Sequence, residues 1–310
     1  MTRLHLDTDL GSDTDDLCAL AMLLGWPDVE LTGITTCIDP GGRRAGFIDY
    51  ALALAGRPDV PVVAGAGGSL GGLALSPIVI PDYWPEPISP RPSPPGAALE
   101  LLEASVGRGA TVVAIGPYTN LAMVEAGRPG LLGSTHVVVM GGHVPDPRAG
   151  LPPWGAHEDF NVQQDRFAAH TVFERCDPVV VPLAATLEVP LRAAHLGPLR
   201  AAGPLGRLLA DQAEAHAHDH GMAEIARSFP ALPDDLLNFQ HDPLACATAI
   251  GWDGVEIERL PIGLELRSDR LWMTVRPAGR PLRVVTRVDR ERFEGEWLDA
   301  VTRASSAGSG

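Results

Sequence analysis

Short apolar runs alternate with helix-like segments through the first 186 residues of this chain. Runs such as TVVAIG, HVVVMGG and PVVVPLAAT are apolar at nearly every position, which is typical of parallel strands buried on both faces. Their repeated alternation with helices predicts an α/β fold, in which a mainly parallel central sheet has helices on both faces. The predicted strands are residues 3–7, 29–37, 60–66, 111–116, 135–141 and 178–185, and the predicted helices are 15–24, 43–55, 96–104, 120–126 and 166–174.

The rest of the chain completes a single predicted domain over residues 1–303. Residues 187–250 have a helical pattern, 254–288 read as a small antiparallel strand addition, and 290–303 read as a closing helix. The Ser- and Gly-rich residues 304–310 are predicted to be a disordered tail. The Pro-rich residues 72–95 are either a surface connection or an active-site lid that carries Tyr83 and Trp84.

Charge and residue usage exclude several classes of function. The formal net charge is −15, and nucleic acids and anionic membranes both require a basic face. All basic side chains are Arg, so Schiff-base chemistry, pyridoxal phosphate attachment and a Walker lysine are excluded. The four Cys are scattered and form no disulfide or zinc pattern. The chain begins directly with a predicted strand and has no long apolar run, so we expect a cytoplasmic protein.

Five aspartates, Asp7, Asp9, Asp13, Asp15 and Asp16, fall within ten residues where the first predicted strand passes into a helix. A helix N-terminus stabilises one or two acidic side chains without any metal. Five carboxylates in so short a segment cannot all be ionised unless a positive charge lies among them. Oxygen ligands in such a group are typical of Ca²⁺ or Mg²⁺, so this segment is a candidate metal site.

Three further motifs lie at the predicted carboxyl ends of strands, where ligands bind in open α/β sheets. In AIGPYTNLAMV (residues 114–124), the turn after a strand exposes a backbone carbonyl that suits a hard cation. In HEDFNVQQD, Asp159 and Asn161 would point to one side of an extended segment, and this pair suits sugar hydroxyls. In FQHDPLACATAI, Asp242 is either a helix cap or a ligand, and His241 is a candidate proton donor.

A histidine group, His216, His218 and His220, lies in EAHAHDHG. His216 and His220 share one helix face, but no HExxH pattern is present. A solvated or pocket-facing helix is therefore favoured over metal binding by these residues.

As a set, DTDLGSDTDDLCAL, GPYTNLA, MGG, DFNVQQD and HDPLA occur in the order found in the inosine–uridine-preferring nucleoside hydrolase family, which this chain resembles over about residues 3–250. The resemblance implies a Ca²⁺-dependent N-ribosyl hydrolase that releases free base and ribose from a nucleoside, in a homodimer or homotetramer. It implies that Ca²⁺ is held by Asp9, Asp16, the carbonyl of Thr119 and Asp242. It further implies a catalytic base at Asp9, a proton donor at His241, and ribose contacts from Asp15, Asp159, Asn161 and Asp242.

The implied reaction agrees with the residue types. Cleavage of an N-ribosidic bond passes through a transition state with oxocarbenium character. Surrounding carboxylates stabilise the positive charge that develops on the ribose, and an acid near the base assists its departure.

The chain departs from the family pattern at several positions. The family motif DxDPGxDD is longer by two residues in this chain, so Asp13 has no counterpart in the motif. The segment TTCIDPGG stands where many members of the family carry a ribose-binding Asn. Where many members carry Glu, this chain has Asp159; Glu158 is one position away and would face elsewhere in an extended segment. The alternatives are a family-like protein with another ribosyl substrate or a non-catalytic binding role, and a phosphatase of the haloacid dehalogenase type, which the absence of Lys disfavours.

Overall fold

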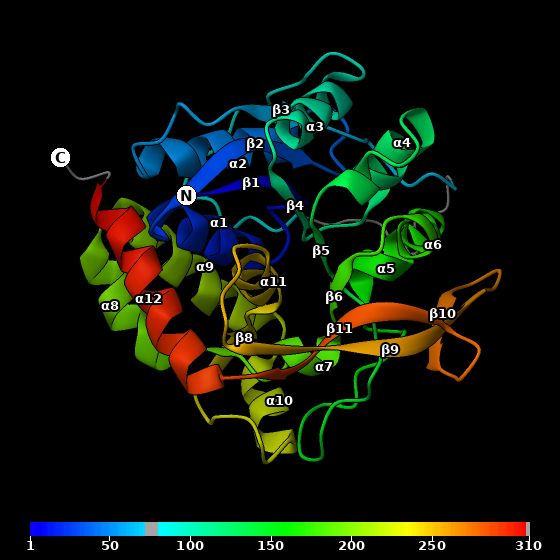
Figure 1. The fold of residues 1–310 in the computed structure, drawn as a ribbon. Coiled ribbons are helices and arrows are strands. Elements are labelled where there is room, and N and C mark those ends of the chain that lie inside the picture. Colours follow the sequence, from blue (N-terminus) through cyan, green and yellow to red (C-terminus); the bar gives the residue numbers. More distant parts are fainter. Residues whose placement is uncertain (72–79, 308–310) are drawn as a thin grey trace.

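The computed structural model describes residues 1–71 and 80–307. Its central sheet has nine strands in the order β10-β9-β11-β6-β5-β4-β1-β2-β3, and the run from β11 to β3 is parallel throughout (Figure 1). The predicted α/β fold with a mainly parallel sheet is confirmed. The strand bounds are β1 Thr2–Thr8, β2 Val29–Thr36, β3 Val62–Ala64, β4 Thr111–Ala114, β5 Val137–Met140, β6 Val179–Val181, β9 Val255–Leu266, β10 Leu271–Val275 and β11 Arg280–Val288.

Helices cover both faces of this sheet because successive strand residues point to opposite sides. Val138 of β5 belongs to one buried cluster together with residues of α1, α2, α9, α11 and α12, whereas Val137 and Val139 belong to a second cluster with α3, α4 and α6. The helix bounds are α1 Asp15–Gly25, α2 Arg43–Leu54, α3 Ala97–Gly107, α4 Thr119–Gly127, α5 Phe160–Gln164, α6 Arg166–Arg175, α7 Leu183–Thr186, α8 Leu196–Ala202, α9 Pro204–Asp219, α10 Met222–Ser228, α11 His241–Ala249 and α12 Arg290–Ala307.

The predicted antiparallel addition is present at one edge of the sheet. Strand β9 pairs antiparallel with β10 on one side and with β11 on the other, and β11 joins the parallel strands by pairing Arg283 with Val179 of β6. None of the described helices is long and apolar enough to cross a bilayer.

Two short elements differ from the prediction. The strand predicted over residues 178–185 ends at Val181, and α7 follows it because Pro182 has no N–H with which to extend the sheet. The region 187–250, predicted to be helical, also contains an antiparallel pair of short strands, β7 (Pro190–Arg192) and β8 (Leu236–Phe239). Strands of three and four residues carry too little periodicity to be recognised in a sequence.

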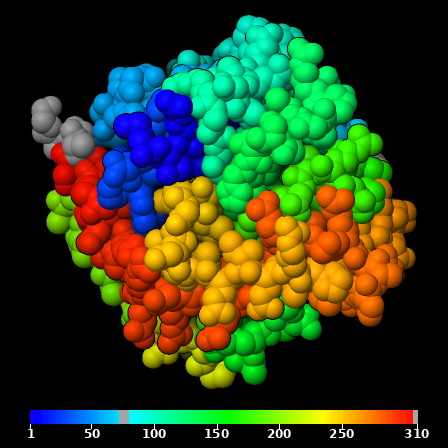
Figure 2. Space-filling model, in the orientation of Figure 1, coloured from blue at the N-terminus to red at the C-terminus, as the bar shows by residue number. Residues whose placement is uncertain are grey.

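The C-terminal helix is longer than predicted. α12 continues to Ala307, so the prediction of a disordered tail from residue 304 is wrong for residues 304–307, and residues 308–310 lie outside the described part. Ala304 and Ser305 are buried, and Ser306 Oγ donates a hydrogen bond to the carbonyl of Ala202. Packing of α12 on α1 and α8 therefore holds this end (Figure 2 shows the red helix against the blue N-terminal segments).

The Pro-rich segment contacts two different parts of the molecule. Residues 72–79 lie outside the described residues, but the remainder is placed. Trp84 is buried and stacks on Phe47 with ring centroids 4.3 Å apart. The adjacent Tyr83 hydroxyl donates to Asp219 of α9 at 2.8 Å. Of the two residues proposed for a lid, Trp84 is thus part of the core and Tyr83 lies at the cavity described below.

One buried histidine gives a test of how stability depends on pH. His5 on β1 is fully buried between Ser105 Oγ and Thr35 Oγ1, at 2.9 and 3.0 Å, and burial lowers its pKa to about 3. Its unfolded pKa is about 6.5, so below that pH the unfolded state binds a proton that the folded state does not bind. Stability therefore falls as pH falls, by about 2 kcal/mol from this group at about pH 5.

Replacing His5 with Gln, which can keep both hydrogen bonds, removes that contribution. We expect the decrease in unfolding free energy from pH 7 to pH 5, measured in urea, to be about 2 kcal/mol smaller in His5→Gln than in the unsubstituted protein. Parallel pH profiles for the two proteins would contradict this assignment.

Candidate active site

A cavity of about 620 Å³ lies at the carboxyl ends of the parallel strands. Ile115, directly after β4, and Met140, the last residue of β5, form part of its floor. The first turns of α1 and α11 meet at the same place. This is the position at which ligands bind in sheets of this topology. The other residues that line it are Asp9, Ser12, Asp13, Asp15, Asp16, Pro81, Tyr83, Trp154, Glu158, Phe160, Asn161, Leu183, His216, Asp219, His220, Met222, Ile225, Asn238, His241 and Asp242.

Three carboxylates converge on the cavity floor. Asp15 and Asp16 are in the first turn of α1, Asp242 is in the first turn of α11, and one oxygen of each lies within 4.8 Å of the others. All three side chains are buried, and Thr8 Oγ1 donates a hydrogen bond to Asp16. The two helix N-termini add partial positive charge, which favours acidic groups there.

The electrostatics of this group suit a cation. Burial raises the pKa of Asp15, Asp16 and Asp242 well above the ordinary value, and repulsion between the neighbouring carboxylates raises it further. A divalent cation would remove that repulsion and hold all three groups ionised. The donor set consists of hard oxygen atoms, which fits the metal ion that the sequence predicted.

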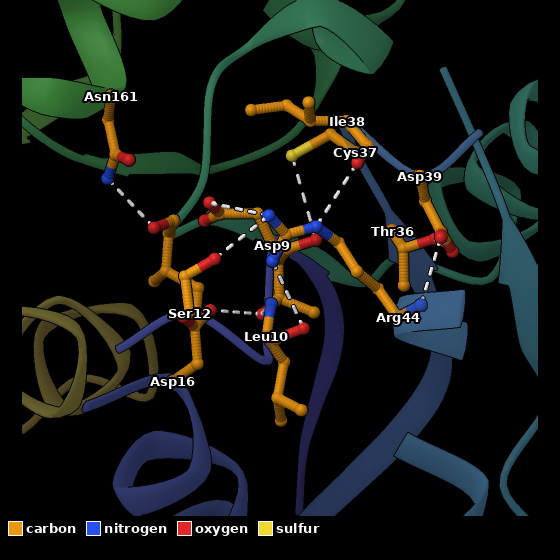
Figure 3. Close-up of polar contacts among 12 residues, drawn as sticks. Asp9, Leu10, Ser12, Asp16, Thr36, Cys37, Ile38, Asp39, Arg44 and Asn161 are labelled. Atoms are coloured by element: carbon orange, nitrogen blue, oxygen red, sulfur yellow. Dashed lines mark hydrogen bonds and ion pairs between the residues drawn. The ribbon is translucent and has the colours of Figure 1, made fainter. Parts of the chain in front are cut away.

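Asp9, directly after β1, lines the cavity but is not part of the three-carboxylate group. Its Oδ2 lies 3.9 Å from Arg44 Nη2, and the Arg44 side chain is completely buried (Figure 3). Burial raises the pKa of Asp9, and the Arg44 charge opposes that rise. The roles of Asp9 as metal ligand and base thus stay predictions, and Arg44 is a charged neighbour that sequence reasoning missed.

Arg44 links the lengthened turn between β1 and α1 to the loop between β2 and α2 through hydrogen bonds. Its guanidinium donates to the carbonyl of Leu10 at 3.2 Å, to Ser12 Oγ at 3.1 Å and to the carbonyl of Ile38 at 3.1 Å (Figure 3). A cation in the first turn of a helix is disfavoured by the helix dipole. The position of Arg44 in the first turn of α2 is the sequence signal that could have indicated an acidic partner for this side chain.

Asp39 of the altered TTCIDPGG segment has a structural role. Its carboxylate accepts hydrogen bonds from the backbone N–H groups of Arg44 and Ala45 and from Thr36 Oγ1. It therefore caps α2 and holds Arg44 in place, and it does not line the cavity.

Thr119 begins α4 and is buried. Its hydroxyl donates to Asp165 Oδ2 at 2.7 Å, and Thr119 is not among the residues that line the cavity. Its predicted carbonyl contact to the metal stays a prediction. Next to it, Asn120 Nδ2 donates to Asp7 Oδ1 at 2.7 Å, and burial is the main cause that raises the pKa of Asp7 to about 7.

The segment expected to be extended around Phe160 is instead the start of α5. Asp159 precedes the helix and accepts a hydrogen bond from the N–H of Gly142 at 3.0 Å, away from the cavity lining. Asn161 lines the cavity and donates to the carbonyl of Ile115 at 2.8 Å. Glu158, which we expected to face elsewhere, lines the cavity, because the chain turns into a helix where strand alternation was assumed.

His241, the predicted proton donor, lies at the cavity beside an aromatic side chain. Its Nδ1 is 2.6 Å from Thr186 Oγ1, and its ring stacks on Trp154 with centroids 6.1 Å apart. Burial lowers its pKa to about 4, so the imidazole is neutral at pH 7. Neither Trp154 nor Thr186 was singled out in the sequence.

The three histidines of α9 and its C-terminal end do not all face the cavity. His216 and His220 line the cavity with rings stacked 4.0 Å apart, which confirms a pocket-facing position, whereas His218 is exposed and pairs with Asp219. The surplus Asp13 also lines the cavity, 3.8 Å from His216. Burial raises the pKa of Asp13, but His216, His241 and Asn238 lower it by more, so its pKa lies below the ordinary value.

A parallel α/β sheet with a carboxylate-lined cavity at its strand ends defines the class of protein, and comparison with known proteins identifies the family. The profile described as inosine-uridine preferring nucleoside hydrolase matches residues 4–295. The chain therefore belongs to this family and is a nucleoside hydrolase.

Individual relatives differ in the base that their names specify. A pyrimidine-specific ribonucleoside hydrolase of Salmonella agona is 31% identical over 222 residues, which are 66% of this chain and 68% of the relative. The structure of a purine-preferring ribonucleoside hydrolase from Gardnerella vaginalis has a TM-score of 0.78 at 23% identity, with 98% and 99% of the two chains covered. An inosine-uridine preferring nucleoside hydrolase from Bacillus anthracis has a TM-score of 0.69 at 19% identity, over 99% and 100%. At these identities the solved structures support the fold alone.

Proposed function

We propose that this protein hydrolyses the N-ribosidic bond of a ribonucleoside in a Ca²⁺-dependent reaction, giving free base and ribose. The observation that carries the proposal is the group of three buried carboxylates, Asp15, Asp16 and Asp242, on the floor of the cavity. So much buried negative charge is costly in a protein that does not bind a cation there.

The carboxylate group has a composition that suits Ca²⁺. Ca²⁺ accepts six to eight oxygen ligands in a flexible arrangement, and the lining adds Asp9 beside the three buried carboxylates. When bound, the ion would orient water and the ribose hydroxyls and provide positive charge at the cavity floor.

The remaining side chains have assigned roles in this proposal. Asp15, Asn161 and Asp242 would bind ribose hydroxyls, and Asp9 would accept a proton from the attacking water. The carboxylates stabilise the positive charge that develops on the ribose as the C1′–N bond breaks. His241 lies at the cavity on the side of Trp154, where a departing base would be in reach of its ring. Asp159 would act indirectly, through the Gly142 backbone that it holds.

A different ribosyl substrate, or binding without catalysis, is the second candidate. The observation that favours it is Arg44, which takes up part of the negative charge of the predicted base Asp9.

The experiment is a panel of purine and pyrimidine ribonucleosides, incubated with the purified protein and followed by chromatography of free base and free ribose. We expect base release that a chelator abolishes and that Ca²⁺ restores. Calcium binding without base release from any nucleoside would favour the second candidate. Release that continues after complete removal of metal would overturn the calcium dependence.

The homodimer or homotetramer that the resemblance implies, and the cytoplasmic location expected from the sequence, are retained as part of the proposal. Sedimentation analysis of the purified protein tests the first of these.

A further inference from the structure

The cavity has an unusual balance of charges. Seven carboxylates line it, and among the described residues that line it there is no Arg or Lys. Four of these carboxylates are Asp9 and the three-carboxylate group, and a divalent ion bound by that group would offset part of their charge. The other three, Asp13, Glu158 and Asp219, lie outside the three-carboxylate group and leave the cavity net negative even with one such ion bound.

Asp13 is held so that one oxygen faces open space. Its Oδ1 accepts hydrogen bonds from the N–H of Thr14 at 2.5 Å, from the N–H of Asp15 at 3.2 Å and from Asn238 Nδ2 at 2.6 Å. Its Oδ2 lies 3.8 Å from His216 Nε2, beyond hydrogen-bond distance, and the side chain is 39% exposed. Three bonds to one oxygen fix the carboxylate and leave the other oxygen available to a ligand.

The neighbouring side chains complete a site of one chemical character. Trp154 is half-buried and lines the cavity; Phe239 packs against it in a T-shaped arrangement with centroids 5.2 Å apart, and His241 stacks on its ring at 6.1 Å. His216 also lines this cavity, with its Nε2 3.8 Å from the open oxygen of Asp13 and its ring stacked on that of His220. An aromatic face beside carboxylates is the arrangement that binds organic cations.

We propose that this wall is the base subsite and that Asp13 makes it select ribonucleosides whose base carries a positive charge, such as pyridinium or N-alkylated purine ribosides. The inference rests on the hydrolase function proposed above and adds the substrate class. A fixed negative charge attracts a cationic ring and repels the carbonyl oxygens of a neutral base such as uracil.

The chemistry of such a substrate suits the same site. When the C1′–N bond of a cationic base breaks, its electron pair returns to the ring nitrogen and the base leaves as a neutral molecule. Water supplies the hydroxyl group to C1′ and releases one proton, so the reaction needs no further reactant. Loss of the positive charge on cleavage also weakens the hold of Asp13 on the product, which favours release.

The test compares kcat/KM for nicotinamide riboside, a permanent cation, with kcat/KM for the neutral uridine, in the unsubstituted protein and in Asp13→Asn. The Asn side chain can retain an acceptor oxygen at the position of Oδ1 and replaces only the open oxygen by an uncharged amide. We expect the ratio of the two kcat/KM values to fall about ten-fold. Because each substrate is compared with itself across variants, differences in intrinsic reactivity cancel.

Asp253→Asn is the matched control, because this carboxylate is exposed and does not line the cavity. It should leave the ratio unchanged. If Asp13→Asn fails to fold, Asp219→Asn takes its place, because the Asp219 carboxylate is exposed and also lines the cavity. This variant should lower the ratio as well. An unchanged ratio in the folded Asp13 variant, or in the Asp219 variant where that substitutes for it, overturns the inference. Failure to hydrolyse either substrate overturns the proposed hydrolase function instead.

Discussion

Asp16→Asn is expected to lower kcat/KM for nucleoside hydrolysis by at least about a thousand-fold, which corresponds to about 4 kcal/mol of transition-state stabilisation. Asp16 is one of three carboxylates whose oxygens lie within 4.8 Å of each other, and Thr8 already orients it. An amide keeps the shape of the side chain but removes the charge that a hard cation requires. The measurements are steady-state kinetics and Ca²⁺ titration by calorimetry.

Asp211→Asn provides the control for this experiment, since the Asp211 side chain is exposed, pairs with Arg200 and does not line the cavity. It should keep both calcium affinity and activity. If Asp16→Asn binds Ca²⁺ as tightly as the unsubstituted protein and hydrolyses nucleosides at a comparable rate, the metal site has been assigned to the wrong carboxylates.

Arg44→Met is expected to lower the free energy of unfolding by about 3–5 kcal/mol in the absence of metal. The variant leaves the carbonyls of Leu10 and Ile38 without their donor and removes the only cationic side chain that contacts Asp9 among the described residues. The lengthened turn then loses its anchor while its carboxylates repel one another. Urea denaturation with and without Ca²⁺ measures the effect.

Calcium should restore part of the lost stability, because a cation bound at the floor stabilises the folded state by mass action and replaces part of the missing positive charge. Arg43→Met is the matched control on the same helix: Arg43 is exposed and lies 5.4 Å from the Phe47 ring, so a loss below about 1 kcal/mol is expected. Equal losses in the two variants, or no effect of Ca²⁺ on Arg44→Met, would show that Arg44 does not compensate the acidic turn.

Much of the fold follows from local patterns. The apolar runs around Val112, Val138 and Val180 are buried on both faces, and a segment with that composition is stable only inside a helix-covered parallel sheet. The order of strands and helices then brings the carboxyl ends of the neighbouring strands β1, β4 and β5 together, and α1 starts beside them. The location of the site was therefore predictable. The approach of Asp242 to Asp15 and Asp16 was implied only by the family resemblance, because α11 follows β8, which is not part of the central sheet.

Where local patterning is weak, the prediction failed. The residues around Phe160 have a composition compatible with strand, helix or turn, and packing against neighbouring elements makes them α5. After Val181 the prediction did not give enough weight to Pro182, which has no N–H for the sheet and comes directly before α7. Near Phe160 this decides which acidic side chain lines the cavity: in an extended segment Asp159 and Asn161 would share one side, but the chain turns before α5, and Glu158 lines the cavity together with Asn161.

By itself, the sequence determined the sheet, the edge at which the site lies, and the chemical character of a carboxylate-rich metal site, since these depend on periodicity, residue type and chain order. Only the tertiary structure decided that Arg44 of α2 reaches Asp9, that Asn238 of β8 holds Asp13, and that Thr186 of α7 contacts His241. These contacts join residues between 35 and 225 positions apart. Their geometry depends on how whole elements pack, and no local interaction in the chain specifies it.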